Sequence, residues 1–414
     1  MAAEPEALGH RQSARVSESD HWLYLITFLL AGAGLVMVLS ASQALAYLEH
    51  RAPLYYFIRQ AAGMGLGVVA LLAIRRIDYH RLRVYAPAAA AVVLILMLLV
   101  LVPGLGIRVN GARRWFSLGP LGSFQPSELG KLMFTLYLAF WIEKRGDRLH
   151  DLYDGLIPFA VLTAVPLFVL MLQKDLGSAM VMAVISASVF YAGGGRKRHL
   201  LLLFGGLLAV FILMTVLEPY RAQRLAVFRD PFKDSLGAGF QSTQALYALG
   251  SGGLTGLGLG HSVQKFLWLP EAHTDFIFAI VGEETGLIGT TALLGGFVFF
   301  AIRGYRGAMR APDHYGVMVA TGITSWIAFQ ALINMGTVTN TLPITGVPLP
   351  LISYGGTSVA TTLAAIGVLL NICAQGWRQN HSRILKGPDA PIDLGRGNRG
   401  APVPGPRRRA SLPR

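Results

Sequence analysis

The sequence predicts an all-α integral membrane protein with about ten transmembrane helices. Of its residues, 53% are hydrophobic and only 14% are charged, whereas soluble globular domains carry about 25% charged residues. Apolar runs such as 84–102 and 199–216 recur along the chain, each near the roughly 20 residues that a helix needs to cross a bilayer. A membrane β-barrel would instead show alternating segments of about ten residues. These observations favour a helical bundle.

Each predicted span is a run that is apolar enough to cross the hydrocarbon core. The spans lie at 22–47, 53–74, 84–102, 127–143, 154–171, 176–193, 199–216, 274–302, 313–338 and 348–375. They form one membrane domain over residues 22–375, between a cytoplasmic N-terminal segment (1–21) and a basic tail (376–414).

Basic residues orient the spans, because cytoplasmic loops carry an excess of Lys and Arg. Every second connection is basic: 75–83, 143–149, 195–199 and 303–310. These loops fall on the same side as the basic tail, so both termini are predicted to be cytoplasmic. The loops that face outward are then 103–126, 172–175, 339–347 and, between helices 7 and 8, the large extracytoplasmic loop 217–273.

The ends of the chain and its single cysteine exclude some protein classes. Residues 1–21 are polar and mixed in charge, so we expect no cleavable signal, and the first apolar run serves as an anchor. Cys373 stands alone, so there is no disulfide framework. Residues 378–414 carry nine Arg or Lys and two Asp, a share of +7 in the net charge of +14. This Pro- and Gly-rich tail reads as disordered, and it either attracts anionic lipid or is simply solvated; nucleic acid is not the predicted partner.

Cations in the outer loops need another explanation, because topology gives no reason for them there. They are Arg108, Arg113, Arg114, Arg221, Arg224, Arg229, Lys233 and Lys265. An anionic partner on the outer face is the simplest interaction that would hold them, and solvated loop charge is the alternative.

The stretch "NGARRWFSLGPLGSFQPSELGK" (110–131) joins a turn at Asn110-Gly111 to a helix start near Pro126. Glu128 and Lys131 are three residues apart and share one helix face just inside the membrane. They either pair for structure or line a polar cavity, since ionisable residues inside membranes usually face a cavity. Arg59 and Asp175, at the outer ends of other spans, could complete that wall.

The outer loop 217–273 contains a basic amphipathic part and the Gly-rich part "GAGFQSTQALYALGSGGLTGLGLGHS". The Gly-rich part suits short interfacial or re-entrant segments rather than a span. Its "GLGLG" has no preceding strand, so it is not a dinucleotide-binding fingerprint.

The stretch "LPEAHTDFIFAIVGEETG" (269–286) places His273, Thr274 and Asp275 at the outer start of a span. Thr274 or Asp275 either caps this helix, or Asp275 acts as a general base whose pKa is raised by desolvation. Glu283 and Glu284 lie about 12 Å deeper at about 1.5 Å per residue, so they must be paired or face water. The candidate partners are Asp175, Arg59 and Lys131.

The stretch "QALINMGTVTNTLPITGVPLPLISYGGTS" (330–358) gives the ninth span a polar outer end and leads into the tenth. Its small residues either let the backbone approach a ligand at a helix N-terminus or pack helices together. Ser353, Gly355, Gly356 and Thr357 are the substrate-binding candidates here.

These motifs together resemble the SEDS family (shape, elongation, division and sporulation), and the resemblance covers about residues 20–375. The motifs are "NGARRWFSLGPLGSFQPSELGKL", "GLGLGHSVQKFLWLPEAHTDFIFAIVGEETG" and "PLPLISYGGTS", and the wording "VMVLSAS" and "LPEAHTDFIFAIVGEE" is closer to the division-type than to the elongation-type members. One departure is "QKDLGSA", where the family more often has Pro before the Asp; it puts the local loop shape in doubt.

The resemblance implies a peptidoglycan glycosyltransferase that polymerises lipid II on the outer face of the bacterial cytoplasmic membrane, at the division septum. It implies that Asp275 is catalytic and that Arg59, Glu128, Lys131 and Asp175 line a central cavity. The implied partners are a class B penicillin-binding protein, which is a transpeptidase, and other divisome membrane proteins.

The chemistry of the residues agrees with that implication. Asp275 would deprotonate the acceptor hydroxyl for inverting transfer, and Arg113, Arg114, Lys131 and Lys265 would stabilise the departing pyrophosphate. A divalent ion, Mg²⁺ or Mn²⁺, could share that task, although the sequence contains no clear ligand set. The alternatives are a flippase for the same lipid-linked precursor, suggested by the membrane-embedded charges, and a non-catalytic scaffold that recruits division partners. A transporter should have its site near the midplane between internal repeats, and no clear repeat is found.

Overall fold

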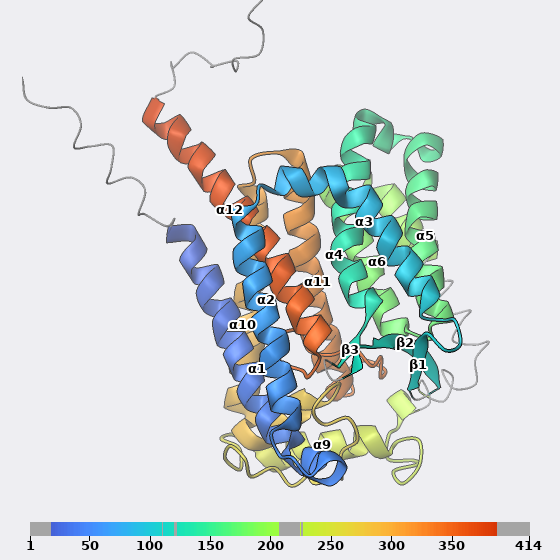
Figure 1. The fold of residues 1–414 in the computed structure, drawn as a ribbon, viewed down its shortest axis with the longest axis vertical. Helices are drawn as coiled ribbons and strands as arrows, with labels where there is room; N and C mark the ends of the chain where they lie inside the picture. The colour runs from blue at the N-terminus through green and yellow to red at the C-terminus, as the bar shows by residue number, and fades with distance from the viewer. Residues whose placement is uncertain (1–17, 110, 120–121, 207–223, 225–226, 387–414) are drawn as a thin grey trace, which may run out of the picture. The chain divides into compact units, whose positions relative to one another are not determined.

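The computed structural model describes residues 18–109, 111–119, 122–206, 224 and 227–386. Residues 1–377 form one compact unit, and residues 378–414 form a second unit. Apart from the last turns of α12, every element described lies in the first unit, which is a bundle of helices (Figure 1).

Seven helices in the described part of the chain are long and apolar enough to cross a membrane. They are α1 (Glu18–His50), α2 (Tyr55–Arg76), α3 (Tyr79–Leu99), α5 (Ile157–Leu172) together with the helical turn Leu152–Leu156 before it, α10 (Ile277–Met309), α11 (His314–Val338) and α12 (Gly356–Lys386). The shorter α6 (Leu176–Ala192) is also apolar, and α4 (Pro126–Arg145) corresponds to the fourth predicted span. Of the predicted seventh span, 199–216, the described residues 199–206 are helical and the rest lies outside the described residues.

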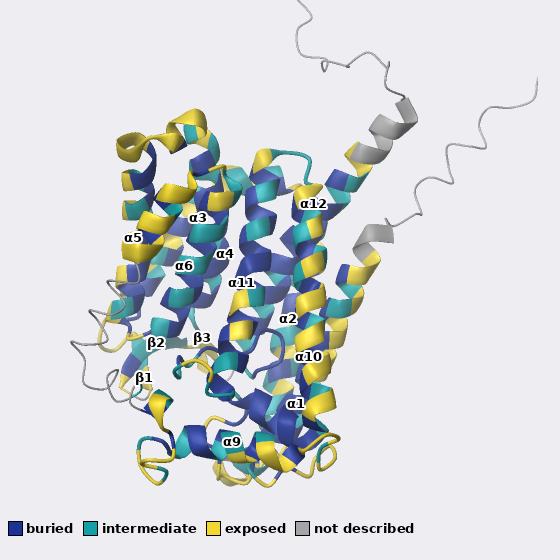
Figure 2. Cartoon of the chain, turned by 180° about the vertical axis from the view of Figure 1, so that it is seen from behind, coloured by how far each residue is buried: buried dark blue, intermediate teal, exposed yellow. Residues whose placement is uncertain are grey.

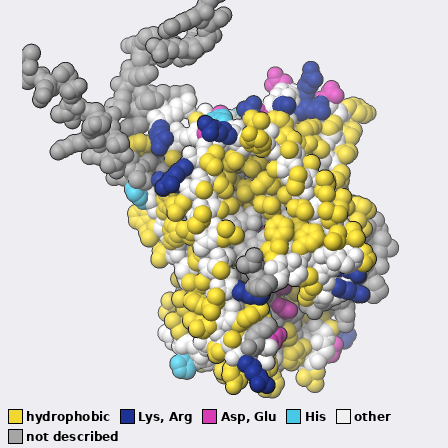
Figure 3. All heavy atoms as spheres, in the orientation of Figure 1, with side chains coloured by type: hydrophobic (Ala, Val, Ile, Leu, Met, Phe, Trp, Pro, Cys, Tyr) yellow, Lys and Arg dark blue, Asp and Glu magenta, His cyan; other side chains and the backbone are white. Residues whose placement is uncertain are grey.

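Large apolar side chains cover the outside of the bundle, as a lipid-facing surface requires. Val84, Leu66 and Phe168 are 72%, 66% and 63% exposed. On the face drawn in Figure 3, apolar side chains cover the middle, whereas Lys and Arg gather toward the two ends. The helical membrane fold is therefore confirmed.

The interior of the bundle is organised around α11, which packs against α10, α6 and α4. Trp326 and Ile323 of α11 are fully buried, and Figure 2 shows α11 as mostly buried, while α1 and α2 carry long exposed stripes. A helix surrounded by other helices can carry polar groups inside the membrane, because its neighbours satisfy them.

Side chains and a proline determine where several helices begin. The carboxylates of Asp78, Asp175 and Asp313 accept hydrogen bonds from backbone N–H groups in the first turns of α3, α6 and α11, which satisfies donors that a helix start leaves open. Pro126 begins α4, where its missing N–H costs nothing. Asp175, a predicted cavity residue, is thus also a helix cap.

The outer loop 103–126 contains a small sheet that the sequence did not predict. Strands β1 (Gly106–Val109), β2 (Ala112–Ser117) and β3 (Ser123–Phe124) form an antiparallel sheet in the order β1-β2-β3. Val109 pairs with Ala112 across the predicted Asn110-Gly111 turn, where Gly111 has a φ of 78°. A two-residue Asn-Gly link of this kind favours a tight hairpin.

The two ends of the bundle differ in structure. The sheet and α9 (Phe240–Gly252) lie at one end (Figure 1). The connection between α4 and α5, a 3₁₀ turn at Gly146–His150 and a π-helical turn at Leu152–Leu156, lies at the other end. By the positive-inside rule the end with α9 is the outer one.

Helix α10 is broken at Gly286, whose φ of 67° and ψ of −164° are not helical. The Gly-rich turn after α9 satisfies the backbone groups at the break. The N–H groups of Leu257 and Gly258 donate to the carbonyls of Glu283 and Glu284 at 2.9 and 3.0 Å. A Cβ at Gly256 would lie 2.2 Å from the Glu284 carbonyl oxygen, so only glycine fits there. The sequence predicted one continuous span at 274–302, whereas the helix starts at Ile277, kinks, and runs to Met309.

Candidate functional site

Asp275 lies at the outer end of the bundle, two residues before α10 begins. Phe276 is the N-cap of α10, and no side chain caps this helix. The hydroxyl of Thr274 donates instead to the carboxylate of Glu271 at 2.7 Å. The capping alternative for Thr274 and Asp275 is therefore wrong, and the Asp275 carboxylate is left for another role.

The pKa of Asp275 is raised from its ordinary value of 3.8 to about 7. Burial is the largest cause, and the negative charge of Glu271 adds to it. Arg114 and Arg224 oppose the rise, and Asp175 supports it. Two cations and two carboxylates thus influence the pKa of Asp275, and its carboxyl group gains or loses its proton near neutral pH.

Arg114 joins strand β2 to the turn between α5 and α6. Its Nε donates to the carbonyl of Gln173 at 3.2 Å, and its Nη2 donates to the carbonyl of Lys174. Its Nη1 lies 3.8 Å from Oδ1 of Asp175. The Asp175 side chain is only 3% exposed, whereas that of Arg114 is 21% exposed, so the guanidinium is the member of this pair that reaches solvent.

The loop before Asp175 explains the departure from the family wording. Lys174 has a φ of 57°, which the ring of a proline forbids because it holds φ near −65°. The loop therefore has a shape that a chain with Pro at this position cannot adopt, and Asp175 after it caps α6.

Arg224 reaches the site from the long outer loop. Its Nη1 donates to the carbonyl of Ile344 at 2.9 Å. The outer loop 339–347 also comes close to Asp275, because a Cβ at Gly346 would lie 3.4 Å from Asp275 Oδ2. Arg224 was one of several outer cations noted in the sequence, and nothing in the sequence singled it out.

The "ISYGGTS" segment holds the backbone that carries Asp275. The hydroxyl of Ser353 donates to the carbonyl of Thr274 at 2.6 Å, and the Tyr354 N–H donates to the carbonyl of His273 at 2.9 Å. Gln60 of α2 holds this segment in turn, donating to the Ser353 carbonyl at 3.1 Å and accepting from the Gly355 N–H at 3.0 Å. Sequence reasoning missed Gln60, whose only signal was a polar side chain inside an apolar span, next to Arg59.

Aromatic rings enclose the neighbouring histidine. The His273 ring centroid lies 4.8 Å from that of Tyr56 and 5.5 Å from that of Tyr354. Burial lowers the pKa of His273, which favours the neutral ring. Arg59 stacks over Tyr55 with 4.4 Å between its guanidinium carbon and the ring centroid. The predicted residues Arg59 and His273 therefore belong to one wall beside Asp275.

The small residues of the "ISYGGTS" segment have structural contacts. A Cβ at Gly63 of α2 would lie 2.7 Å from the Gly356 Cα, so the two helix backbones touch at this point. The hydroxyl of Thr357 donates to the Ser123 carbonyl at 3.0 Å, which ties α12 to the sheet. Gly356 therefore fits the alternative in which these small residues pack helices together. The Gly355 N–H donates to Gln60 rather than remaining open for a ligand.

Strained backbone is found close to Asp275. Glu271 and Leu351 have φ values of 56° and 64°, an uncommon region for residues with a side chain. The Leu351 carbonyl lies against α1, since a Cβ at Gly34 would come within 2.1 Å of it. Such strain persists only where the surroundings hold it, and it is concentrated at functional sites.

Glu128 and Lys131 form a buried ion pair in α4. Lys131 Nζ lies 2.7 Å from Glu128 Oε1 and donates to Gln330 Oε1 at 2.9 Å, and both residues are at most 2% exposed. These contacts therefore fit the alternative in which Glu128 and Lys131 pair with each other for structure. Gln330 and Asn334 are one turn apart on α11, about 6 Å, and Asn334 binds the Asp275 backbone.

Lys265 does not join the cations around Asp275, and its predicted contact with pyrophosphate is not supported. It is 4% exposed, and its Nζ lies 3.1 Å from Glu284 Oε1 and 2.6 Å from the Gly260 carbonyl. The Gly-rich turn folds back onto the break in α10 and carries Lys265 there.

Glu283 and Glu284 are held by this turn rather than by Asp175, Arg59 or Lys131, so the predicted partners are wrong. Glu283 accepts hydrogen bonds from the Ser262 hydroxyl and from the Val263 N–H, the latter at 3.0 Å.

Arg113 makes a different contact from Arg114. Its side chain donates to the Leu101 carbonyl at 3.4 Å. Successive side chains on a strand point to opposite faces of the sheet, so on β2 only Arg114 faces Asp175. Arg113 and Arg114 were predicted to act together, and the pleat separates them.

In the described part of the chain, no three His, Cys, Asp or Glu side chains gather as a metal ion would need. The described residues therefore show no site that would hold a divalent ion by protein ligands alone.

Comparisons with known proteins agree on one family. Residues 21–376 match the family model FTSW_RODA_SPOVE, described as "Cell cycle protein". The chain is 40% identical to stage V sporulation protein E of Bacillus subtilis over 87% of this chain and 98% of that protein. It is 39% identical to the probable peptidoglycan glycosyltransferase FtsW of Thioalkalivibrio sulfidiphilus, over 88% and 92% of the two chains.

Solved structures give the same picture of the fold. One match is a chain from a structure of a peptidoglycan synthase complex that coordinates polymerization and crosslinking. It has a TM-score of 0.70 at 30% identity, over 86% of this chain and 98% of that one. The rod shape determining protein RodA of Thermus thermophilus matches with a TM-score of 0.63 at 31% identity, over 85% and 95% of the two chains.

Proposed function

Because the chain belongs to the cell cycle protein family of FtsW, RodA and SpoVE, we propose that it is a peptidoglycan glycosyltransferase that polymerises lipid II. The observation that carries this proposal is Asp275, a carboxylate with a pKa of about 7 beside Arg114 and Arg224 at the outer end of the bundle. The relatives named FtsW favour a role in septal wall synthesis during cell division.

Asp275 acts as the general base. Its carboxylate takes the proton from the GlcNAc 4-hydroxyl of the acceptor, and the oxygen attacks the anomeric carbon of the lipid-linked donor from the face opposite the phosphate. The new glycosidic C–O bond forms as the bond to the phosphate oxygen breaks, which inverts that carbon. A base works best when its pKa lies near the working pH, and burial places the pKa of Asp275 there.

Arg114 and Arg224 are the two cations proposed to stabilise the departing pyrophosphate. Pyrophosphate departs on its polyprenyl carrier with the electron pair of the broken bond, and fixed guanidinium groups stabilise such developing charge. The positive charges of Arg114 and Arg224 lower the pKa of Asp275, and both side chains are partly exposed. They replace Arg113 and Lys265 in the predicted cation set.

The remaining neighbours of Asp275 position it. Ser353 and Asn334 hold the carbonyls of Thr274 and Asp275, and Gln60 holds the Ser353 segment. Arg59 and His273 provide a wall for the sugar or peptide part of the substrate. Glu128, Lys131 and Asp175 support this surface from inside the bundle.

The proposed partners follow from the family resemblance, and the name of one relative supports them. One similar chain is part of a peptidoglycan synthase complex, so a class B penicillin-binding protein, a transpeptidase, is the proposed partner of this chain, together with other divisome membrane proteins. The multi-pass chain would then reside in the bacterial cytoplasmic membrane at the division septum, with Asp275 on its outer side.

The break in α10 is a structural feature that favours the flippase alternative, because transporters place substrate sites at broken helices. In this chain the backbone groups at the break bind the loop 253–258, so they are not left for a substrate. The break closes a loop onto the bundle, and the enzyme remains the better-supported function.

The deciding experiment incubates purified protein with labelled lipid II, with and without a cognate transpeptidase. Asp275→Asn should stay folded and membrane-inserted but form no glycan strands. Asp154→Asn removes the same charge from an exposed position at the other end of the bundle, and it should polymerise normally. Substantial polymerisation by purified Asp275→Asn would overturn the base assignment.

A further inference from the structure

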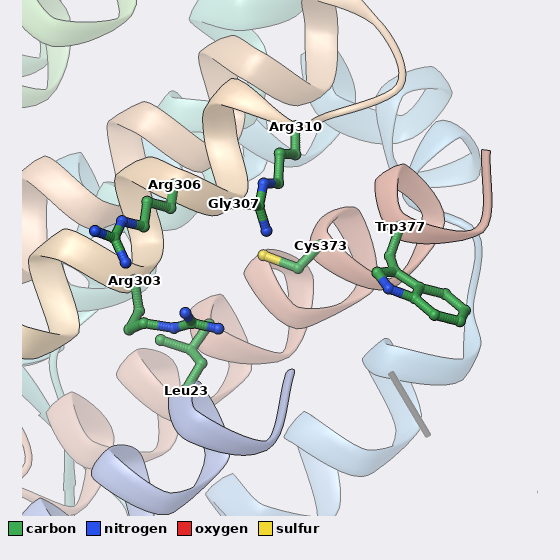
Figure 4. Close-up of a pocket in the computed structure, with 7 residues that line it drawn as sticks. All are labelled: Leu23, Arg303, Arg306, Gly307, Arg310, Cys373 and Trp377. Carbon is green, nitrogen blue, oxygen red and sulfur yellow. The ribbon is translucent and has the colours of Figure 1, made fainter. Parts of the chain in front are cut away.

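A hollow lined by three arginines lies at the inner end of α10, the opposite end of this helix from Asp275. Its lining is formed by Leu23 of α1, by Arg303, Arg306, Gly307 and Arg310, and by Cys373 and Trp377 of α12. The hollow is shallow and partly open to the surroundings. None of the lining side chains is acidic. Figure 4 shows the Arg310 guanidinium pointing toward the Cys373 sulfur and the Arg306 guanidinium turned outward.

Close backbone packing shapes this hollow. A Cβ at Gly307 would lie 2.3 Å from the Cys373 sulfur, and one at Gly376 would lie 2.0 Å from the Arg310 carbonyl oxygen. Helices α10 and α12 therefore touch at this end, and Leu23, which is 2% exposed, closes the side toward α1. The hollow is thus a rigid feature of the packing and not a gap between loops.

The arginines gather on one helix face. Positions 303, 306 and 310 are spaced by three and four residues, which places them on the same side of a helix. Arg306 and Arg310 are exposed, so their guanidinium groups are available to a ligand. The positive-inside rule requires basic residues on this side of the membrane, but it does not require them to surround one concave surface.

Apolar side chains continue from the hollow toward the membrane interior. On α1, Trp22 and Leu25 are 53% and 50% exposed, and on α10, Phe299 and Ile302 are 37% and 44% exposed. The rings of Trp22 and Phe299 meet edge to face with 6.1 Å between centroids, which joins the two helices into one apolar surface. Trp22 and Trp377 are also of the residue type that gathers at headgroup level.

We propose that this hollow binds the phosphate headgroup of an anionic phospholipid of the inner leaflet. The positive charge of Arg303, Arg306 and Arg310, which line the hollow, attracts the phosphate, and the apolar surface of α1 and α10 holds the acyl chains. A free phosphate ion would make no use of that surface, so the lipid is the occupant that the whole surface fits. This site is separate from the proposed glycosyltransferase site and does not depend on it.

The test uses the purified full chain and the variant Arg306→Gln/Arg310→Gln. Native mass spectrometry measures its affinity for phosphatidylglycerol, for phosphatidylcholine and for inorganic phosphate. Each basic residue near a membrane surface contributes a factor of about five in anionic lipid binding, so the double variant should bind phosphatidylglycerol at least about tenfold more weakly. The matched control is Arg196→Gln/Arg198→Gln, which removes the same charge from exposed positions of another inner loop and should stay within about twofold of the unmodified protein.

Cys373 provides a second measurement that needs no variant. It is the only cysteine of the chain and it lines the hollow, so a small thiol reagent such as methyl methanethiosulfonate reports on the site directly. Phosphatidylglycerol should slow the modification of Cys373, whereas phosphatidylcholine and inorganic phosphate should not. Equal protection by inorganic phosphate would replace the lipid by a free anion. No protection by phosphatidylglycerol, or equal weakening in both double variants, would overturn the site.

Discussion

The side-chain amide of Asn334 binds the backbone of Asp275, the proposed base, and the backbone of Val347 in the outer loop 339–347. The Nδ2 of Asn334 donates to the carbonyl of Asp275 at 2.7 Å and to the carbonyl of Val347 at 2.7 Å. Asn334 is fully buried on α11, the helix at the centre of the bundle. The position of Asp275 is therefore set by the rigid core rather than by the outer loop that precedes it.

Replacing Asn334 by Leu should lower both stability and turnover. Two buried carbonyls lose their donor, which costs about 2–4 kcal/mol of unfolding free energy. A small displacement of a catalytic group costs up to about 100-fold in rate, so we expect kcat per folded protein to fall about 10- to 100-fold with a smaller change in KM. Lipid II polymerisation and thermal unfolding measure the two effects.

Asn371→Leu is the matched control for this prediction. Asn371 is also buried, and its amide donates to the Arg75 carbonyl at 2.6 Å. This substitution should lower the unfolding temperature to a similar degree while kcat per folded protein stays near normal. If both variants lose turnover equally, Asn334 has only a structural role.

The rate of polymerisation should rise with pH through about 7. The base form of Asp275 is the deprotonated one, and burial raises its pKa to about 7. Arg114 holds that pKa down, so Arg114→Gln should move the acid limb of the kcat/KM profile to higher pH. An acid limb that stays in place in Arg114→Gln would contradict the electrostatic link.

The same pKa makes a prediction about stability. A carboxylic acid whose pKa is higher in the folded protein binds protons more tightly there, so its contribution to stability is present at low pH. That contribution is lost as pH rises from about 4 to about 7. Asp275→Asn should therefore flatten the dependence of the unfolding temperature on pH in this window, relative to Asp154→Asn.

Arg113 and Arg114 make a natural pair of variants, because they are adjacent and carry the same charge. Arg114→Gln should lower kcat about 100-fold, since it removes a donor for the leaving pyrophosphate and the link to Asp175. Arg113→Gln should lower it less than about fivefold, because that side chain contacts the Leu101 carbonyl. Equal losses would show that the two faces of β2 do not differ in function.

The buried contact between Lys265 and Glu284 predicts a stability effect. Their side chains are 3% and 0% exposed, and removing one member of such a pair costs about 3–5 kcal/mol because the other charge stays buried. Lys265→Met should lower the unfolding temperature strongly, and Lys265→Met/Glu284→Gln should recover part of the loss. If Lys265→Met retains its stability and loses only polymerisation, Lys265 belongs to the substrate site after all.

The sequence by itself determined the membrane fold and nine of the ten helices within the described residues, and it predicts the outer position of the Asp275 motif. These features depend on local properties. A bilayer demands long apolar runs whatever their neighbours, and the alternating basic loops carry their own topological signal. The polar motifs are continuous in sequence, so His273, Asp275 and Ser353 were recognisable without knowing what surrounds them.

Only the tertiary structure decided which cations meet Asp275. Arg114 and Arg113 differ by one position on a strand, and the pleat sends them to opposite faces. Arg224 and Lys265 come from one long loop, and its Gly-rich turn folds onto the break at Gly286, which buries Lys265 against Glu284. Gln60 and Asn334 hold the site from inside apolar helices. Contacts between residues far apart in the chain depend on how helices and loops pack, and neither composition nor periodicity records that packing.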